Sequence, residues 1–115
     1  MRVSFVVPGN PVPWQRARSA RGQRFTAPET RIYRDKVRAH AHNARVRPLA
    51  GPVQIACVFH RSTRHACDID NLIKTVLDAL NGVAYADDRQ VVHIVARKAV
   101  DASHPRAEIE IGAAA

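Results

Sequence analysis

The chain has little lysine, few acids and no long apolar run. Its 115 residues include only three lysines, against fifteen arginines, and only ten Asp or Glu. The apolar run nearest the N-terminus, residues 3–7, is too short for a secretion signal or a membrane-spanning helix. We therefore expect no membrane partner.

Cysteine is also scarce. Cys57 and Cys67 are too few for a disulfide framework, so we expect a reducing cytoplasmic location. Cys57 lies in a strand-like apolar run, where a thiol is typically buried. His60 and His65 lie near Cys67, but the spacing is not that of a zinc site, so zinc is not expected.

Charge is distributed unevenly within what the length predicts to be one domain, residues 1–115. The formal net charge is +8 and the isoelectric point about 10.7. Residues 1–64 carry 13 Lys or Arg against two acids, whereas residues 65–115 carry five against eight. A G+C-rich genome would explain the preference for arginine but not this imbalance. The basic part indicates a polyanionic partner.

Hydrophobic periodicity predicts the order strand, helix, strand, helix, strand, strand. This order is typical of a small α/β domain with a mixed β-sheet covered by two helices. Asn10–Gln23, with two prolines and no periodicity, is expected to be an exposed loop, and a turn at Ser103–Pro105 joins the last two strands. The predicted elements are Val3–Val7, Pro28–Arg45, Val53–His60, Asp70–Leu80, Val91–Val100 and Ala107–Ile111.

Half of the acids are concentrated in residues 68–88, around the second predicted helix. Asp68 and Asp70 stand at its start, Lys74 follows one turn later, and Asp87 and Asp88 come after its end. If the later pair folds back toward the helix start, the carboxylates surround a space of metal-ion size. Hard cations such as Mg²⁺ take oxygen ligands of this kind, usually together with water and substrate phosphates.

A purely structural interpretation of the same acids also stands. Asp70 is a good helix N-cap, it could pair with Lys74 at i, i+4, and Asp87 and Asp88 suit a turn. An EF-hand is excluded, because Ile73 and Ala79 occupy positions that require Gly and Glu.

The arginines of the N-terminal half form a candidate DNA-binding surface. They lie in the loop and on one face of the first predicted helix, which favours contacts with phosphates over a merely solvated face. Trp14, inside this basic loop, is suited either to stacking on a base or to packing against the sheet. The candidate DNA-binding residues are Arg16, Arg18, Arg21, Arg31 and Arg38.

Three segments together resemble the RusA family of Holliday junction resolvases. They are Asp68-Ile69-Asp70-Asn71-Leu72-Ile73-Lys74, then Asp78-Ala79-Leu80-Asn81-Gly82, then Asp87-Asp88-Arg89-Gln90-Val91. The opening Pro8-Gly9-Asn10-Pro11-Val12-Pro13, with Arg16 and Arg18, also looks like that family's N-terminal pattern.

The resemblance implies a Mg²⁺-dependent, homodimeric endodeoxyribonuclease that nicks four-way DNA junctions in recombination and repair, often encoded in prophages, with no small-molecule cofactor. It makes Asp68, Asp70 and Asp88 metal ligands, leaves Asp87 as a possible alternative to Asp88, and makes Lys74 the essential lysine. Two other functions remain open: a non-catalytic basic protein that binds DNA junctions, and a ribonuclease that uses the same chemistry.

Overall fold

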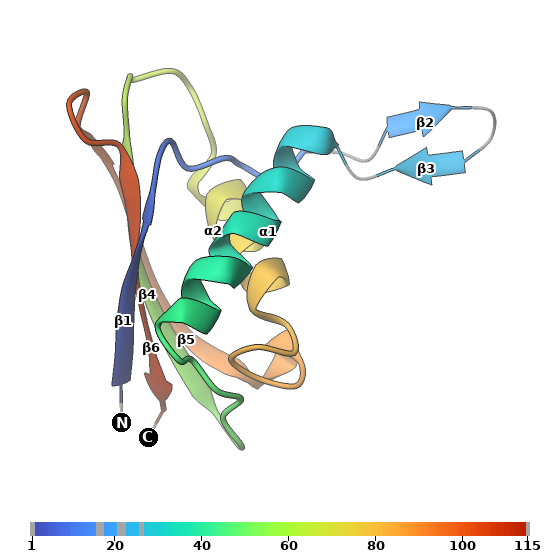
Figure 1. Ribbon diagram of the computed structural model, residues 1–115, viewed down its shortest axis with the longest axis vertical. Helices are drawn as coiled ribbons and strands as arrows, with labels where there is room; N and C mark the ends of the chain where they lie inside the picture. Colours follow the sequence, from blue (N-terminus) through green and yellow to red (C-terminus); the bar gives the residue numbers. More distant parts are fainter. Residues whose placement is uncertain (1, 16–17, 21–22, 26, 115) are drawn as a thin grey trace.

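Strand β4 (Val53–Arg61) is the centre of the sheet in the computed structural model, which describes residues 2–15, 18–20, 23–25 and 27–114. Residues 53, 55, 57 and 59 are buried and alternate with half-buried neighbours, the period of a strand with one covered face. β4 pairs in parallel with β5 (Val91–Val100) and antiparallel with β6 (Arg106–Ala113). β6 also pairs antiparallel with β1 (Arg2–Pro8), which gives the order β1-β6-β4-β5 (Figure 1).

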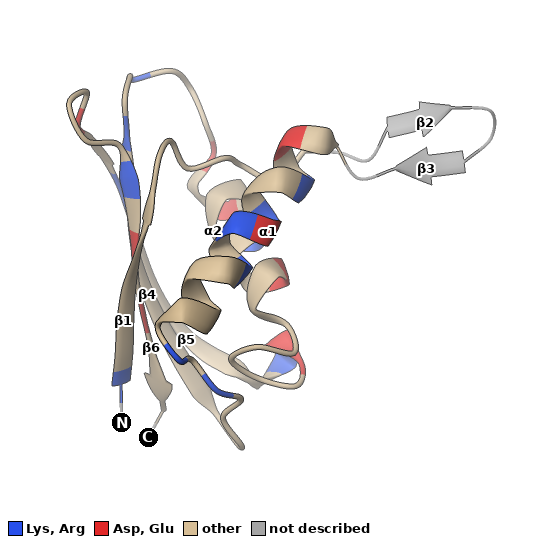
Figure 2. Ribbon diagram, in the orientation of Figure 1, with Lys and Arg blue, Asp and Glu red and all other residues tan. Residues whose placement is uncertain are grey.

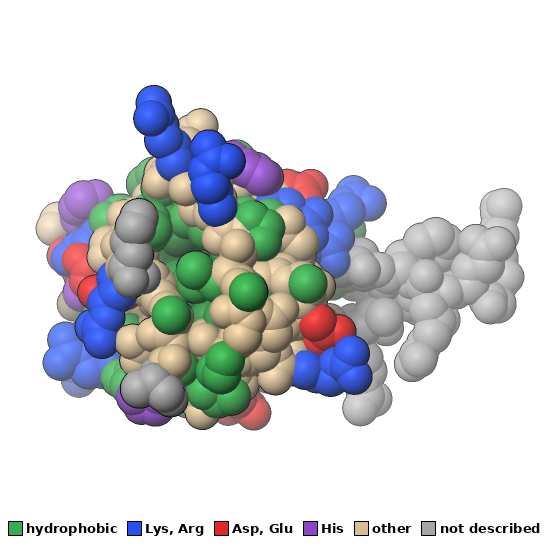
Figure 3. Space-filling model, turned by 90° about the horizontal axis from the view of Figure 1, so that it is seen from below, with side chains coloured by type: hydrophobic (Ala, Val, Ile, Leu, Met, Phe, Trp, Pro, Cys, Tyr) green, Lys and Arg blue, Asp and Glu red, His purple; other side chains and the backbone are tan. Residues whose placement is uncertain are grey.

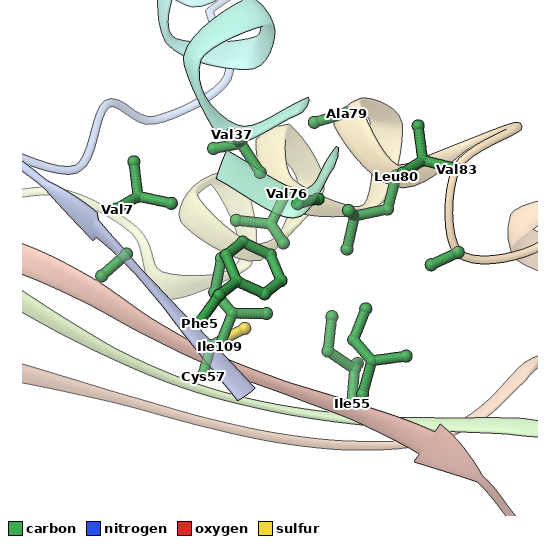
Figure 4. Close-up of a cluster of buried hydrophobic side chains, with 14 of the residues drawn as sticks. Phe5, Val7, Val37, Ile55, Cys57, Val76, Ala79, Leu80, Val83 and Ile109 are labelled. Atoms are coloured by element: carbon green, nitrogen blue, oxygen red, sulfur yellow. The ribbon is translucent and has the colours of Figure 1, made fainter. Parts of the chain in front are cut away.

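Helices α1 (Pro28–Asn43) and α2 (Ile69–Leu80) lie on one face of this sheet, and the other face is uncovered (Figure 1). Parallel strands need a crossover connection, and α2 is the crossover between β4 and β5. The core fills the space between helices and sheet (Figure 4). It includes Phe5 and Val7 of β1, Val37 of α1, Ile55 and Cys57 of β4, Val76 and Leu80 of α2, and Ile109 of β6.

The predicted α/β domain with a mixed sheet and two helices is confirmed, and the helix and strand boundaries agree within two residues. Cys57 is buried as expected, and burial raises the pKa of its thiol to about 12. No helix among the described residues is both long and apolar enough to cross a membrane.

The prediction of a loop over Asn10–Gln23 is wrong in its second half. Short strands β2 (Arg18–Ala20) and β3 (Gln23–Phe25) pair antiparallel as a hairpin that projects from the body beside the start of α1 (Figure 1). β2 and β3 form a sheet of their own, separate from the four-stranded sheet. A strand of three residues is too short for an alternating apolar pattern, so periodicity gave no signal for it.

The last two strands are joined by a turn but do not pair with each other, because β4 lies between them. Asp101 orders the turn: its carboxylate accepts hydrogen bonds from the backbone and hydroxyl of Ser103 and from the backbone of His104, and it pairs with Arg106 at 3.0 Å. These donors, Ser103 first, lower the pKa of Asp101 to about 2. The turn therefore keeps this ionised anchor well into the acidic range.

Helix α1 ends at Asn43, two residues before the predicted end, in a Schellman motif. The backbone N–H of Arg45 donates to the carbonyl of His42, and that of Val46 donates to the carbonyl of Ala41, each at 3.0 Å. This motif needs a left-handed residue, and Arg45 supplies it with φ of 62°. Glycine usually occupies this position, because a side chain there crowds the following carbonyl.

Replacing Arg45 with glycine should therefore stabilise the fold, by about 1 kcal/mol, through relief of this backbone strain. Urea unfolding at neutral pH measures the change. Arg45→Ala is the matched control: it removes the same charge but keeps a β-carbon, so it should stay close to the parent. Equal gains in both variants would show that the charge, and not the backbone, is responsible.

Candidate active site

The start of α2 carries two carboxylates, Asp68 and Asp70, that make few contacts with the described part of the fold. The helix N-cap is Asp68, whose backbone is extended (φ −74°, ψ 131°) and whose side chain makes no capping bond. Asp70, in the first turn, accepts only the adjacent backbone N–H of Asn71, at 2.9 Å. Both residues are exposed, and within the described chain neither is part of an ion pair. Negative charge near a helix N-terminus is itself favourable.

The structural interpretation of Asp70 is thus not what the fold shows. Asp70 is not the N-cap, because the helix begins one residue earlier than predicted and the cap position falls on Asp68. Nor does it pair with Lys74. The ammonium of Lys74 lies over the indole of Trp14, 5.0 Å from the ring centroid.

Asp87, in contrast, has a clear structural role. It caps the short 3₁₀ helix η1 (Asp88–Gln90): its carboxylate accepts the backbone N–H of Arg89 at 2.8 Å, and the Gln90 side chain accepts the backbone N–H of Asp87 at 3.3 Å. Hydrogen bonds from Arg89, the backbone one first, lower the pKa of Asp87. The side-chain amide of Gln90 also donates to the carbonyls of Leu49 and Gly51, which ties this turn to the loop before β4.

The two acidic pairs lie at opposite ends of α2 (Figure 2). A helix of 12 residues is about 18 Å long. Within the described residues, no three His, Cys, Asp or Glu side chains come close enough together to hold a metal ion. The expectation that Asp87 and Asp88 fold back to the helix start is therefore not met within one chain.

Tyr85 explains why the later acids stay at the far end. Its hydroxyl donates to the carbonyl of Leu77 at 2.8 Å, and its side chain is fully buried against the last turn of α2. Burial is the main cause that raises the pKa of this phenol. The segment after the helix is thus held at the C-terminal end of α2.

Asp68 and Asp70 alone fit a cation that takes one or two protein carboxylates. Mg²⁺ usually binds in this way and completes its octahedron with water and substrate phosphate oxygens. A site with three carboxylates from one chain does not fit the observed arrangement, because Asp88 lies beyond the other end of the helix.

The predicted DNA-binding arginines fall into two groups. Arg16 and Arg21 lie outside the described residues, and of Arg18 only the backbone is described. Arg31 is exposed on α1. Arg38, however, donates from Nε to the carbonyl of Ala79 at 2.9 Å and so links α1 to the end of α2. Part of its hydrogen-bonding capacity is therefore used by the fold.

The end of the molecule where β1 begins is not a continuous basic face. Seen from that end, the Lys and Arg side chains of the described residues stand apart around a largely uncharged centre (Figure 3). A continuous band of positive charge, as contact with several DNA phosphates requires, is therefore not seen at this end of the described residues.

Sequence reasoning missed the contact between Trp14 and Lys74. It considered only a DNA base or the sheet as partners of this indole. The chain has one tryptophan, placed among prolines and arginines where no periodicity explains it. That isolated position was the available signal, but the partner could be found only once the loop and α2 were placed together.

Comparison with known proteins gives a consistent result. A family described as endodeoxyribonuclease RusA matches residues 8–112. Relatives named crossover junction endodeoxyribonuclease RusA, from Escherichia coli strain K12 and from Shigella sonnei strain Ss046, are each 36% identical to this chain over 91 residues. The matched region covers 77% of this chain and 76% of each relative.

The two later acids should separate experimentally, because only Asp87 caps η1. Asp87→Ala should lower the urea midpoint of unfolding, whereas Asp87→Asn, which keeps a capping oxygen, should lower it much less. Asp88→Asn should leave the midpoint at the parental value. A fall with Asp88→Asn as large as that with Asp87→Ala would contradict this division of roles.

Proposed function

Because the chain belongs to the RusA family of endodeoxyribonucleases, we propose that it is a Mg²⁺-dependent enzyme that resolves four-way DNA junctions by paired symmetric nicks. The observation that carries the proposal is the exposed pair Asp68 and Asp70 at the start of α2. Among the described residues neither carboxylate forms an ion pair, and Asp70 accepts only the backbone N–H of Asn71. Lys74 follows one turn later.

In this proposal each residue has a separate task. Asp68 and Asp70 hold the metal ion, which when bound supplies an activated water and neutralises charge on the scissile phosphate. Lys74 places a positive charge beside the phosphate, where it stabilises negative charge that develops in the transition state. Because Lys74 has no carboxylate partner among the described residues, its full charge is available to the substrate.

We assign Asp88 to the same reaction on the strength of its match to the family motif. Since one chain keeps it at the far end of α2, we infer that it joins the site only in the assembled complex with DNA. Asp87, which caps η1, is the less suitable of the two.

Binding of DNA is assigned mainly to arginine–phosphate contacts. Such contacts supply affinity and register without reading sequence. Arg31 is the described candidate, Arg16, Arg18 and Arg21 extend the set along the chain, and Arg38 contributes through the nitrogens that do not bind Ala79.

A homodimer is proposed because a four-way junction presents two equivalent strands to cut, whereas each chain has one proposed active site, at the start of α2. The uncovered face of the sheet offers a surface for this contact. Val6 and Val95 are about half exposed there (46% and 54%), beside Ala56 and Val58. A hollow of about 600 Å³ lies over this face.

The charges of the same face suit contact with a second copy. Glu108 and Glu110 lie on β6, whereas Arg97, on the edge strand β5, has no ion-pair partner among the described residues. A surface that carries both signs around an apolar centre can complement itself across a two-fold axis.

The alternative of a non-catalytic junction-binding protein is favoured only by the basic residues 1–64. It predicts binding of DNA without any cleaved product. A gel of a labelled four-way junction, incubated with protein in the presence and absence of Mg²⁺, distinguishes the two functions.

Asp70→Asn should abolish cleavage of a synthetic four-way junction and leave its binding unchanged or slightly tighter. The variant removes a metal-holding charge but no arginine–phosphate contact. Cleavage and gel-shift assays at the same Mg²⁺ concentration measure the two effects. Asp35→Asn, the same change on exposed α1, is the control and should cut at the parental rate. Retained nicking by Asp70→Asn would overturn the site.

Val95→Asp should convert the dimer to a monomer, because it places a charge in the apolar centre of the uncovered face. Sedimentation velocity at micromolar protein measures the change. Ile32→Asp, at an exposed apolar position on α1, is the matched control and should remain dimeric. A parental dimer in Val95→Asp would place the contact elsewhere, and a monomeric parent that makes paired nicks would contradict the dimer.

A further inference from the structure

The segment Gly9–Gln15, here called the N-terminal arm, follows β1 without regular secondary structure but is fixed to the body along its length. Near its start the backbone N–H of Gly9 donates to the carbonyl of Pro105 at 2.9 Å. One residue later the side-chain oxygen of Asn10 accepts the backbone N–H of Ser62 at 2.8 Å. These bonds direct the arm across the ends of β6 and β4 toward the helices.

The end of the arm is held against the starts of both helices. The backbone N–H of Trp14 donates to the carbonyl of Asn71, in the first turn of α2, at 2.8 Å. The hydroxyl of Thr30, only 1% exposed in α1, donates to the carbonyl of Pro13 and accepts the N–H of Gln15. The backbone on each side of Trp14 is therefore fixed, and this fixes the point from which the indole extends.

From this position the indole lies against Lys74, with the ammonium 5.0 Å from the ring centroid. A tryptophan face attracts a cation through its quadrupole. Unlike a carboxylate, it restrains the ammonium without neutralising its charge. Lysine is otherwise a flexible side chain with several rotatable bonds, so the contact limits where its charge can be.

We propose that Trp14 is a positioning residue that holds the ammonium of Lys74 beside the carboxylates at the start of α2. The N-terminal arm is then part of the active site, although in this role the Trp14 side chain contacts neither DNA nor metal. The inference rests on the proposed function, since it concerns the same lysine, but the contact can also be measured without cleavage.

The first experiment measures cleavage with Trp14→Leu and Trp14→Phe. Leucine has no aromatic face, whereas phenylalanine keeps a weaker one. Neither change removes the backbone bonds of the arm. The single-turnover rate should fall about tenfold or more for leucine and less for phenylalanine. The dissociation constant for the junction should stay within about twofold of the parental one. The urea midpoint should stay at the parental value.

A double-mutant cycle assigns the effect to Lys74. In a Lys74→Ala background, Trp14→Leu should have no further effect on the residual rate, because the group that it positions is absent. Multiplicative losses would overturn the proposal. Equal losses of rate and junction affinity in Trp14→Leu would also overturn it and would make Trp14 a base-stacking residue.

The second experiment needs no substrate. Trp14 is the only tryptophan, so fluorescence excited at wavelengths that the two tyrosines do not absorb reports its surroundings alone. Lys74→Met should change the emission intensity of the folded protein, whereas Lys36→Met, a lysine of α1, should not. If the parent failed to cut junctions but this change occurred, the proposed function would fail while the contact stood; an unchanged spectrum would overturn the contact itself.

Discussion

β4 is bonded on both sides, in parallel to β5 and antiparallel to β6, and this arrangement determines where the chemistry can be. A parallel neighbour cannot be reached by a tight turn, so the chain must leave the end of β4 and return along the sheet. α2 makes that return with its apolar side buried in the same core as alternate residues of β4. Its first turn is therefore fixed near the edge where β4 ends, and Asp68 and Asp70 are fixed with it.

The acids of this chain differ in how far the fold already uses them. Asp101 orders a turn, Asp87 caps η1, and Glu108 pairs with His60 and Arg106. Within the part of the chain that the structure describes, Asp68 and Asp70 have no comparable role: Asp68 makes no side-chain capping bond, and Asp70 accepts only the adjacent N–H of Asn71. Carboxylates left exposed and without such partners keep their oxygens available for an external ligand.

Periodicity recovered the elements that have one buried face. Val53 to Phe59 alternate because β4 is covered on one side only, and Leu72, Val76 and Leu80 recur at helical spacing for the same reason. Periodicity did not predict β2 and β3, because strands of three residues are too short to show such a pattern. The expected return of Asp87 and Asp88 to the start of α2 is not observed within one chain. The buried Tyr85, which donates a hydrogen bond to the Leu77 carbonyl, holds that segment at the opposite end, and no local sequence pattern indicates this contact. The contact of Trp14 with Lys74 joins residues 60 positions apart, and no local pattern encodes it.

The pairing of β1 with β6 has a consequence for the order of folding. Arg2 lies opposite Gly112, so the first strand of the sheet has no partner until the last one is available. Pairing over such a separation closes a long loop and is slow compared with helix formation. During synthesis α1 and the βαβ unit of β4, α2 and β5 can form earlier, but the edge of β4 that β6 covers stays open. The arm that follows β1 then still lacks its bond from Gly9 to the carbonyl of Pro105, so its anchoring beside the start of α2 is complete only when the last strand has been added.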